Sequence, residues 1–548
     1  MSCITKQHVG KYTYLYESTS FRNAEGKPRN KKVRIGKIDP KTGNTIYTPE
    51  YLERMEAAGT PVAVEDNSDA DVDIADVLDS SKRYGSYCLF KELANSIKLL
   101  PTLQRALPDC FREVFTLACF LVESQEPLSY CSDWLAETEA LPLLERSRLS
   151  SQRISELLSS ITMAQRDMFY TFWMDQVPRN QYVALDITSI SSYSELIESC
   201  EWGYNRDHED LPQINLCMLF GEDVRLPLYQ ASYSGSISDV MTLKTTLKEV
   251  TILLPDRELR VVMDKGFYSQ KNVDAMLEPE SPVHFLISVP FSSSFAKKLV
   301  ESERKDIDRI ENTILTGGTA IRGIHQVRRW HTKSRNTDIH AHVYFNPIKA
   351  ATERNELYAY VTELKQEALK DPLQGNLQKD FKKYLIIRKS SKAPSGWTVS
   401  INEKAIEEHL KYCGWMVLLS DTIDDSQEAL DTYRTKDVVE KSFDRLKNTL
   451  DLNRLRVHKD IRMENKLFVS FIALLLISAL HQRMKAGSLY KKYTMHELLL
   501  KVRKLQIAHV NGKKIIQPIS KEQRMIFKDL GLKAPVGSKS SGILGRKR

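Results

Sequence analysis

The chain has 548 residues and a formal net charge of +8, with 42% hydrophobic and 27% charged residues. These values are typical of a soluble globular protein of three or four domains, because the length exceeds one ordinary core. The longest apolar run, residues 467–480, is shorter than the roughly 20 residues that cross a bilayer, so a buried core helix is predicted. No apolar stretch of a secretory signal opens the chain, and eight scattered cysteines without a CxxC pair predict reduced thiols in a cytosolic protein.

The charge is unevenly distributed along the chain. Residues 433–548 hold 27 Lys and Arg against 9 Asp and Glu, and residues 1–48 hold 10 against 3. The part between them is therefore net acidic. Basic ends of this kind favour the binding of a polyanion, so a nucleic acid is the predicted partner.

Three kinds of segment precede residue 180. Alternating apolar residues and the turn-forming "DPKTGN" predict short strands within residues 10–48. The Asp-rich residues 64–81 are typical of a linker. Residues 85–178 show the apolar spacing of helices.

The pattern changes to strands at residue 181. Apolar runs predict strands at 181–187, 213–220, 225–233, 259–264 and 283–289, and helices at 238–254 and 269–277. The order is β-β-β-α-β-α-β, and the first three strands form an antiparallel meander. The next element expected on this plan is a helix. The pattern of residues 290–425 predicts a long insertion of mixed strands and helix that precedes it.

The helix expected next begins near residue 434, in "YRTKDVVEKSFDRLKNTLDLNRLRV" (433–457), where Glu440 stands among many Lys and Arg. At about 100° per residue, apolar side chains from Val439 to Leu450 form a buried stripe. The polar arc beside this stripe consists of Tyr433, Lys436, Glu440 and Lys447. An exposed Lys–Glu pair four residues apart is the simpler interpretation of this arc.

Two further carboxylates end predicted strands. Asp186 ends the first strand and Asp264 the strand after the first helix, and these strands are expected to be parallel neighbours about 4.8 Å apart. Open α/β sheets place ligands at such carboxyl ends. If the helix near 434 lies across the sheet, Glu440 joins the two aspartates. Three carboxylates this close repel one another, and they favour a site that binds divalent cations. The alternative for each aspartate is the capping of the following turn.

Three segments resemble the catalytic blocks of insertion-sequence transposases with a DDE triad: "YVALDITSIS", "VVMDKGFYS" and "YRTKDVVEKSFDRLK". The last block is similar to the Tyr-x2-Arg-x3-Glu-x6-Lys signature of the IS-four superfamily. Lys436 stands where Arg is usual and loses the bidentate fork, and Ser236 stands where Asn is expected. "GYNRDHEDLPQINLCMLF" and "GKPRNKKVRIGKIDPKTG" also resemble large members, so the resemblance covers most of residues 10–480.

The resemblance implies an α/β fold class: an RNase H-like mixed-sheet catalytic core with a mixed β/α insertion, an N-terminal β-rich region and an α-helical domain. Seven segments are expected on this basis. They are a basic, DNA-binding β-rich domain (1–62), an acidic linker (63–82), a helical domain (83–179), the first part of the core (180–289), the insertion (290–425), the final core helices (426–485) and a basic C-terminal region with a disordered tail (486–548).

The resemblance further implies cut-and-paste transposition. Asp186, Asp264 and Glu440 would bind two Mg²⁺ or Mn²⁺ ions, and water would free a 3′-hydroxyl at each transposon end, which then attacks target DNA. The residues expected to contact DNA are Tyr433, Arg434, Lys436, Lys447, Arg328, Arg329 and Trp330. In members that form a DNA hairpin, an insertion-domain Trp stacks on a flipped base, and Trp330 is the first candidate, before Trp397 and Trp415. A buried Trp is the alternative.

The implied partners are double-stranded DNA, as transposon ends and target, and a second copy of the chain, without any membrane. The expected location is the cytoplasm of a prokaryote, at the nucleoid. Two other functions stay open from the sequence. One is a transposase-derived DNA-binding protein without catalysis, and the other is a metal-dependent nuclease without a joining step.

Overall fold

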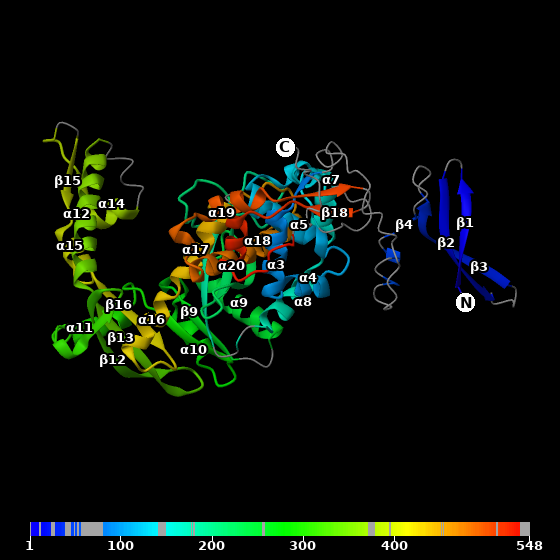
Figure 1. Cartoon of the computed structure of the whole chain (residues 1–548). Coiled ribbons are helices and arrows are strands. Elements are labelled where there is room, and N and C mark those ends of the chain that lie inside the picture. Colours follow the sequence, from blue (N-terminus) through cyan, green and yellow to red (C-terminus); the bar gives the residue numbers. More distant parts are fainter. Residues whose placement is uncertain are drawn as a thin grey trace, which may run out of the picture. The chain divides into compact units, whose positions relative to one another are not determined.

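The chain divides into two compact units, whose elements are labelled in Figure 1. One unit contains residues up to Arg83 together with Leu505–Ile519, and the other contains Tyr84–Lys504 and Ser520–Pro535. The computed structural model describes residues 2–9, 12–22, 28–38, 45–48, 50–51, 54–55, 81–140, 149–176, 178, 181–254, 258–370, 379–393, 396–450, 452, 454–510 and 513–536.

The first unit contains two small antiparallel sheets. One has the order β1-β2-β3-β4, with bounds Ser2–Val9, Tyr12–Arg22, Pro28–Ile38 and Thr45–Tyr47. The other has the order β18-β17-β5, with bounds Lys513–Ile516, Gln506–Val510 and Lys82–Arg83. Strands are therefore confirmed within residues 10–48. The "DPKTGN" turn and nearly all of the acidic linker lie outside the described residues.

Helices open the second unit. They are α3 Gly85–Ser96, α4 Leu99–Ala106, α5 Phe111–Ser124, α6 Cys131–Ala136, α7 Ser151–Ser160 and α8 Met163–Met174. Helices α3, α5 and α7 all contact α18, Asp460–Ala486. Of the described helices, α18 alone is long and apolar enough to cross a membrane, and 89% of its apolar window is buried within the protein. The predicted core helix at residues 467–480 is therefore confirmed.

A nine-stranded sheet forms the centre of this unit, in the order β11-β12-β13-β16-β10-β9-β6-β7-β8. Its first strands are β6 Tyr182–Ser191, β7 Gln213–Gly221, β8 Pro227–Ser234, β9 Leu259–Met263 and β10 Val283–Ser288. Strand β9 is parallel to both β6 and β10, whereas β6, β7 and β8 form an antiparallel meander. With α9 (Asp239–Leu253) and α10 (Gln270–Met276), the predicted order β-β-β-α-β-α-β is confirmed.

The region after β10 differs from the prediction in one respect. A helix follows at once, α11 (Ser294–Glu303), because Phe295, Ala296, Leu299 and Val300 supply an apolar side at helical spacing. Four later strands extend the large sheet beyond β10. They are β11 Thr313–Thr316, β12 Thr319–His331, β13 Asn336–Phe345 and β16 Trp415–Ser420. Strand β16 pairs antiparallel with β10. It therefore covers the edge that β10 would otherwise leave open.

The middle of the insertion has a core of its own. It is built from α12 Pro347–Lys370, α14 Lys379–Tyr384, β14 Leu385–Lys389, β15 Trp397–Ile401 and α15 Glu403–Leu410. The buried side chains of this core include Leu357, Val361, Leu364, Phe381 and Ile406. They do not belong to the cluster of the large sheet, so this part folds around a separate apolar centre.

The helix predicted from about residue 434 is divided. Helix α16 spans Ser426–Arg434, α17 spans Asp437–Asp444, and a π-helical turn covers Arg445–Thr449. Backbone groups of Thr435 and Lys436 hydrogen-bond back to Thr432 and Tyr433, which ends α16 before α17 begins. The predicted apolar stripe is nevertheless buried, and α17 contacts β6 and β7. Glu440 is therefore carried by a helix that lies on the large sheet.

Candidate functional site

Strand register brings the two aspartates together. The parallel ladder of β6 with β9 pairs Leu185 with Met263 as its last residues, and Asp186 and Asp264 are the next residues on each strand. The prediction that Asp186 ends its strand is wrong, because β6 continues to Ser191 along β7. Asp186 instead lies where β6 parts from β9, which opens one side of the sheet at that residue.

Each aspartate caps its own backbone with one oxygen. Asp186 Oδ1 accepts the amide N–H of Ile187 at 2.9 Å, and Asp264 Oδ1 accepts that of Lys265 at the start of a short 3₁₀ turn. The capping interpretation thus holds for these two oxygens. In each aspartate the other oxygen, Oδ2, faces the ammonium of Lys436.

Lys436 is the centre of the site. Its Nζ lies 3.0 Å from Glu440 Oε1, 3.6 Å from Asp264 Oδ2 and 4.0 Å from Asp186 Oδ2. Because all three oxygens lie within 4.0 Å of the same nitrogen, the three carboxylates are close to one another. The Lys436 side chain is only 8% exposed, against 18% for Asp186, so the ammonium is enclosed by the carboxylates that it neutralises. The structure thus gathers the three acids that the sequence singled out.

Burial sets the protonation behaviour of these groups. It raises the pKa of Asp186 to about 6, against the opposing effect of the Lys436 ammonium. Burial disfavours the charge on Lys436, yet Asp186 and Asp264 raise its pKa above the ordinary value. The hydroxyl of Tyr433 donates to Asp264 Oδ1 at 3.5 Å, and burial raises the Tyr433 pKa to about 12. Tyr433 therefore acts here as a neutral donor.

The fit of the site to divalent cations depends on its oxygens. Three carboxylates are the hard oxygen donors that Mg²⁺ and Mn²⁺ prefer, so the chemistry of the donor set fits. As arranged, however, no group of three His, Cys, Asp or Glu side chains in the described part of the chain is placed to hold a metal ion. Lys436 accounts for this at the triad, because its ammonium takes the position between the three acids.

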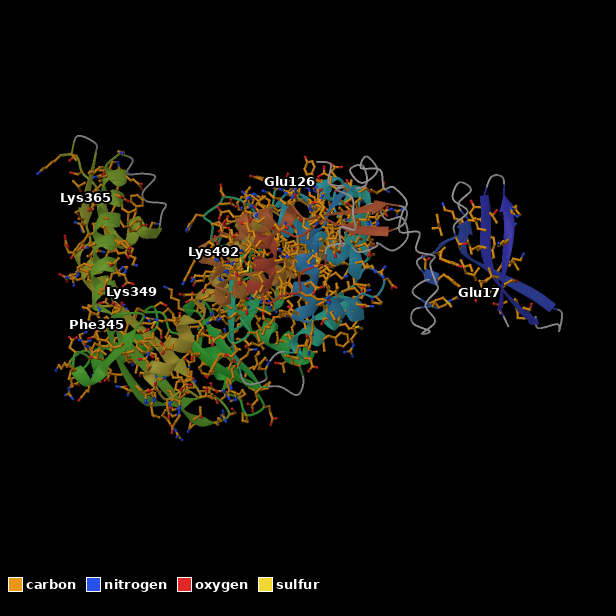
Figure 2. All side chains as sticks on the ribbon, in the orientation of Figure 1. Glu17, Glu126, Phe345, Lys349, Lys365 and Lys492 are labelled. Atoms are coloured by element: carbon orange, nitrogen blue, oxygen red, sulfur yellow. The ribbon has the colours of Figure 1, made fainter. Side chains whose placement is uncertain are left out.

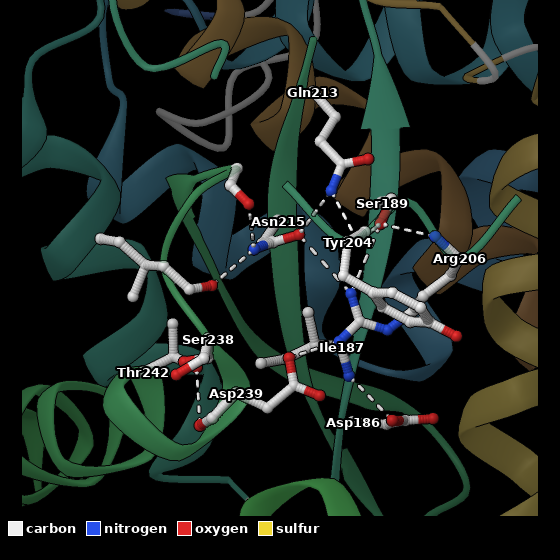
Figure 3. Close-up of polar contacts among 12 residues, drawn as sticks. Asp186, Ile187, Ser189, Tyr204, Arg206, Gln213, Asn215, Ser238, Asp239 and Thr242 are labelled. Carbon is white, nitrogen blue, oxygen red and sulfur yellow. Dashed lines mark hydrogen bonds and ion pairs between the residues drawn. The ribbon is translucent and has the colours of Figure 1, made fainter. Parts of the chain in front are cut away.

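A polar network supports β6 beside Asp186 (Figure 3). Arg206, on the connection from β6 to β7, forms an ion pair with Asp239 at the start of α9. It also lies 3.4 Å from the Ser189 hydroxyl and 3.5 Å from Asn215 Oδ1. Sequence reasoning missed Arg206 and Asp239, because their partners are distant in sequence and only the meander brings them together. His208 on the same connection is exposed.

The predicted DNA-contacting cations of the α16–α17 region do not all join the triad. Lys447 Nζ lies 2.5 Å from Asp207 Oδ2, on the β6–β7 connection, and its side chain is 12% exposed. Arg434 donates to the hydroxyl of Thr316 on β11. Tyr433 and Lys436 contact the carboxylates, whereas Lys447 is neutralised by a different acid.

The structure places Trp330 in the core. It is 7% exposed, its indole N–H donates to Asp274 Oδ1 at 2.8 Å, and its ring meets Phe295 edge to face. This is the buried tryptophan that the sequence left as the alternative, and in this structure no base can stack on it. Arg329 is exposed and paired with Asp338 at 3.1 Å, and Arg328 Nη2 lies 3.5 Å from the Ser302 hydroxyl.

A large groove leads away from the triad. Its volume is about 1170 Å³, and its walls combine Asp264, Lys436 and Glu440 with residues of the insertion. The cations on the groove wall include Lys265, Lys297, Lys349 (Figure 2), Lys383 and Arg434. The rings of Phe291 and Tyr412, also on the wall, stack with centroids 5.0 Å apart. Cations beside half-buried aromatic rings are typical of grooves that bind nucleic acid. This wall also carries the acids Glu353, Glu356, Glu408 and Asp437, and Glu408 and Glu353 form ion pairs with Lys297 and Lys349, so its positive charge is partly neutralised.

Comparisons with known proteins find one family. A family model described as a transposase DDE domain matches residues 178–476, which contain all three acids of the site. The search of curated proteins finds no match. Among solved structures, the piggyBac transposase synaptic complex with hairpin DNA, solved by cryo-electron microscopy, overlaps at a TM-score of 0.36 and 10% identity. The overlap covers 71% of this chain and 69% of that chain, and a score this low defines no shared fold.

Proposed function

The chain belongs to the family of proteins with a transposase DDE domain, and from this premise we propose that it is a cut-and-paste DNA transposase of the IS-four superfamily. It would cleave DNA at the ends of an insertion sequence and join the freed 3′-hydroxyls to target DNA. The proposal includes an RNase H-like core, made of β6 to β10 with α9 and α17. The observation that carries it is the convergence of Asp186, Asp264 and Glu440 on one ammonium.

Asp186, Asp264 and Glu440 would hold two Mg²⁺ or Mn²⁺ ions. When bound, such ions activate an attacking oxygen and stabilise the leaving oxygen in phosphodiester displacement. The aspartates are positioned for this role because backbone amides fix their Oδ1 atoms. Within the described part of the chain, Lys436 is the only donor that faces their Oδ2 atoms. Glu440 is 58% exposed, so it can adjust its position most easily.

Lys436 would change partner during this process. Its ammonium neutralises the acids in the metal-free protein, and it must leave their centre when divalent cations bind, because like charges repel at such distances. Tyr433, Lys436 and Lys447 would then contact phosphates beside the scissile bond, with Arg434, Arg328 and Arg329 farther along the DNA. Lysine gives a point charge here in place of the bidentate fork of arginine.

Double-stranded DNA is the proposed substrate, and the groove beside the triad is its proposed path. Its cations and stacked rings are suited to phosphates and unpaired bases. Cleavage at two ends requires two active sites, so we propose a homodimer assembled on DNA, in the cytoplasm of a prokaryote at the nucleoid, with no membrane involved. Most of residues 1–62 and the basic C-terminal region would contact end sequences through phosphates.

Cleavage of a supercoiled plasmid that carries the DNA flanking both sides of the gene tests this function. We expect Mg²⁺-dependent nicking by the wild type and a loss of at least about a hundredfold in Glu440→Gln, since one ligand carboxylate is neutralised. Glu428→Gln, the same change at an exposed position on α16, is the matched control and keeps activity. Equal cleavage by Glu440→Gln and wild type would show that the catalytic assignment is wrong.

The same assay separates the alternative functions. A DNA-binding protein without catalysis would bind the flanking DNA and leave it intact in Mg²⁺ and in Mn²⁺. A nuclease would free 3′ ends that are never found joined to a second duplex. Recovery of joined products with both ends attached to target DNA is the result expected for a transposase.

A further inference from the structure

A second cavity lies on another side of α17, away from the triad. Its volume is about 360 Å³, and none of its wall residues lines the groove that contains Asp264, Lys436 and Glu440. The wall is formed by the turn between β7 and β8, by α17 with the π-helical turn, and by the end of α18. The wall residues with polar side chains are Arg225, Lys441, Arg445, Ser478, His481, Gln482 and Lys485.

The charge of this cavity is unbalanced. Four wall residues are Lys or Arg, and none is Asp or Glu. Among the described residues, Arg225, Lys441, Arg445 and Lys485 form no ion pair within 4.0 Å. The nearest acid that acts on Arg445 is its exposed neighbour Asp444, which does not line the cavity. Arg225, Lys441 and Lys485 are exposed and Arg445 is half-buried, so an anion that joins the four cations would gain most at Arg445.

The electrostatic effect of the cluster is visible on its neighbours. Burial, together with Arg445, Lys485, Lys441 and Arg225, lowers the pKa of His481 to about 4, so this histidine is neutral near pH 7. Burial also lowers the pKa of Arg445. The His481 shift has the direction expected where positive charge accumulates in a partly enclosed space, whereas the Arg445 shift reflects burial alone.

A buried hydroxyl on the same wall lacks a partner. Ser478 of α18 is 1% exposed, and its Oγ has no hydrogen-bond partner in the described part of the chain. An unsatisfied buried hydroxyl costs about 1–3 kcal/mol, so such groups usually mark a missing ligand or water. Its Oγ is itself buried, so it could donate to an anion among the four cations only after the side chain turns toward the cavity.

The cavity is also fixed in shape. Gln482 Nε2 donates to the carbonyls of Val224 and Arg225 at 2.9 and 2.6 Å, which ties the β7–β8 turn to α18. Arg225 itself has a left-handed backbone with φ of 50°. A non-glycine residue in that region is uncommon and is retained only where the surroundings hold it. The Arg225 backbone is thereby held in place at the cavity wall.

From these observations we propose that the cavity between α17, α18 and the β7–β8 turn is an anion-binding site for a phosphate group. Arg225, Lys441, Arg445 and Lys485 would supply charge, and Ser478 would supply a neutral donor. Guanidinium and ammonium groups around a small cavity match the tetrahedral oxygens of phosphate. The phosphate belongs either to a DNA backbone or to free inorganic phosphate. The site does not depend on catalysis, because it shares no residue with the triad.

Calorimetric titration of the full-length protein with inorganic phosphate tests the site, at constant ionic strength set with chloride. We expect saturable binding by the wild type and an affinity lower by roughly tenfold or more in Arg445→Met, since a charge-assisted hydrogen bond is lost. Ser478→Ala should weaken binding several-fold without lowering the melting temperature, because its hydroxyl has no protein partner. Lys244→Met, at an exposed position on α9, is the matched control and should bind as the wild type does.

The source of the phosphate is decided by a second titration, with a 30-base-pair duplex. If Arg445→Met weakens duplex binding and reduces its salt dependence by about one phosphate contact, the ligand is DNA. If only binding of inorganic phosphate weakens, the ligand is the free ion. The proposed site would be overturned if the wild type binds phosphate no more strongly than it binds chloride. It would also be overturned if Arg445→Met and Lys441→Met both bind phosphate as the wild type does. Lys441→Met keeps the test valid if Arg445→Met does not fold, and Glu440→Gln should bind phosphate normally even where it cannot cleave DNA.

Discussion

Lys436 determines the electrostatics of the active site at the level of single residues. Replacement by Met removes the ammonium that three carboxylates share, and their mutual repulsion is then uncompensated. We expect the metal-free Lys436→Met variant to lose on the order of 2 kcal/mol of unfolding free energy, below the value for a fully buried pair because Asp264 and Glu440 are partly exposed. Thermal unfolding in the presence of a chelator measures this loss.

The same variant should respond more strongly to metal. With no ammonium to displace, added Mn²⁺ should raise the melting temperature of Lys436→Met by more than that of the wild type. Lys244→Met, which removes an exposed charge on α9, should match the wild type in both conditions. If Mn²⁺ stabilises the wild type more than Lys436→Met, Lys436 does not compete with the ions.

The pKa of Asp186 gives the metal-free protein a defined pH dependence. Burial raises this pKa to about 6 from an unfolded value near 3.9, so between about pH 4 and pH 6 the folded state binds more protons than the unfolded state. The contribution of Asp186 to the free energy of unfolding therefore falls by about 2–3 kcal/mol as the pH rises through that window. Urea unfolding at pH 4.5 and 6.5 should show this decrease in the wild type and a smaller one in Asp186→Asn. An identical pH dependence in both proteins would contradict the raised pKa.

The identity of the three acids could be predicted from the sequence, whereas the position of Lys436 could not. Asp186, Asp264 and Glu440 are marked by apolar runs that precede or flank them. Lys436 lies between the end of α16 and the start of α17, and nothing in the helical spacing marks that interruption or the approach of its ammonium to both aspartates. If the helix is assumed to be continuous, its spacing predicts only the contact between Lys436 and Glu440, which are four residues apart.

At the level of elements, the connection between β6 and β7 controls a proposed DNA contact. Asp207 neutralises Lys447 in this structure. Replacement by Asn should free the ammonium and raise affinity for duplex DNA several-fold, while Lys447→Met should lower affinity and reduce the salt slope by about one. Gel-shift titrations at several salt concentrations measure both effects.

A matched charge change serves as the control for that experiment. Asp210→Asn removes the same charge from an exposed neighbour on the connection that has no contact with Lys447. It should change affinity much less than Asp207→Asn does. Equal effects of the two variants would mean that net charge alone, and not the ion pair, governs binding.

The elements themselves were predictable to different degrees. The order of β6 to β10 follows from short apolar runs and turn residues, which are local signals. The extension of the sheet through β16, β13, β12 and β11 depends on pairing between distant residues, which no local pattern encodes. Trp330 shows the same limit. Its flanking arginines indicated an exposed site, but Asp274 and Phe295, which bury it, lie far away in the sequence.

At the level of the whole molecule, the basic C-terminal end should contribute to DNA affinity. Residues 537–548 contain four Lys and Arg and no acid. Their removal should lower affinity for any duplex sequence and reduce the slope of log affinity against log salt by up to about four, since each cation can release one counterion. An unchanged slope in the truncated protein would exclude this segment from the DNA interface.

The location of divalent cations tests the central claim most directly. Crystals of the protein soaked in Mn²⁺ should show anomalous density between the carboxylates of Asp186, Asp264 and Glu440, with the Lys436 ammonium withdrawn from their centre. Density absent from this position, with Lys436 Nζ still within 4.0 Å of all three acids as in the present structure, would contradict it.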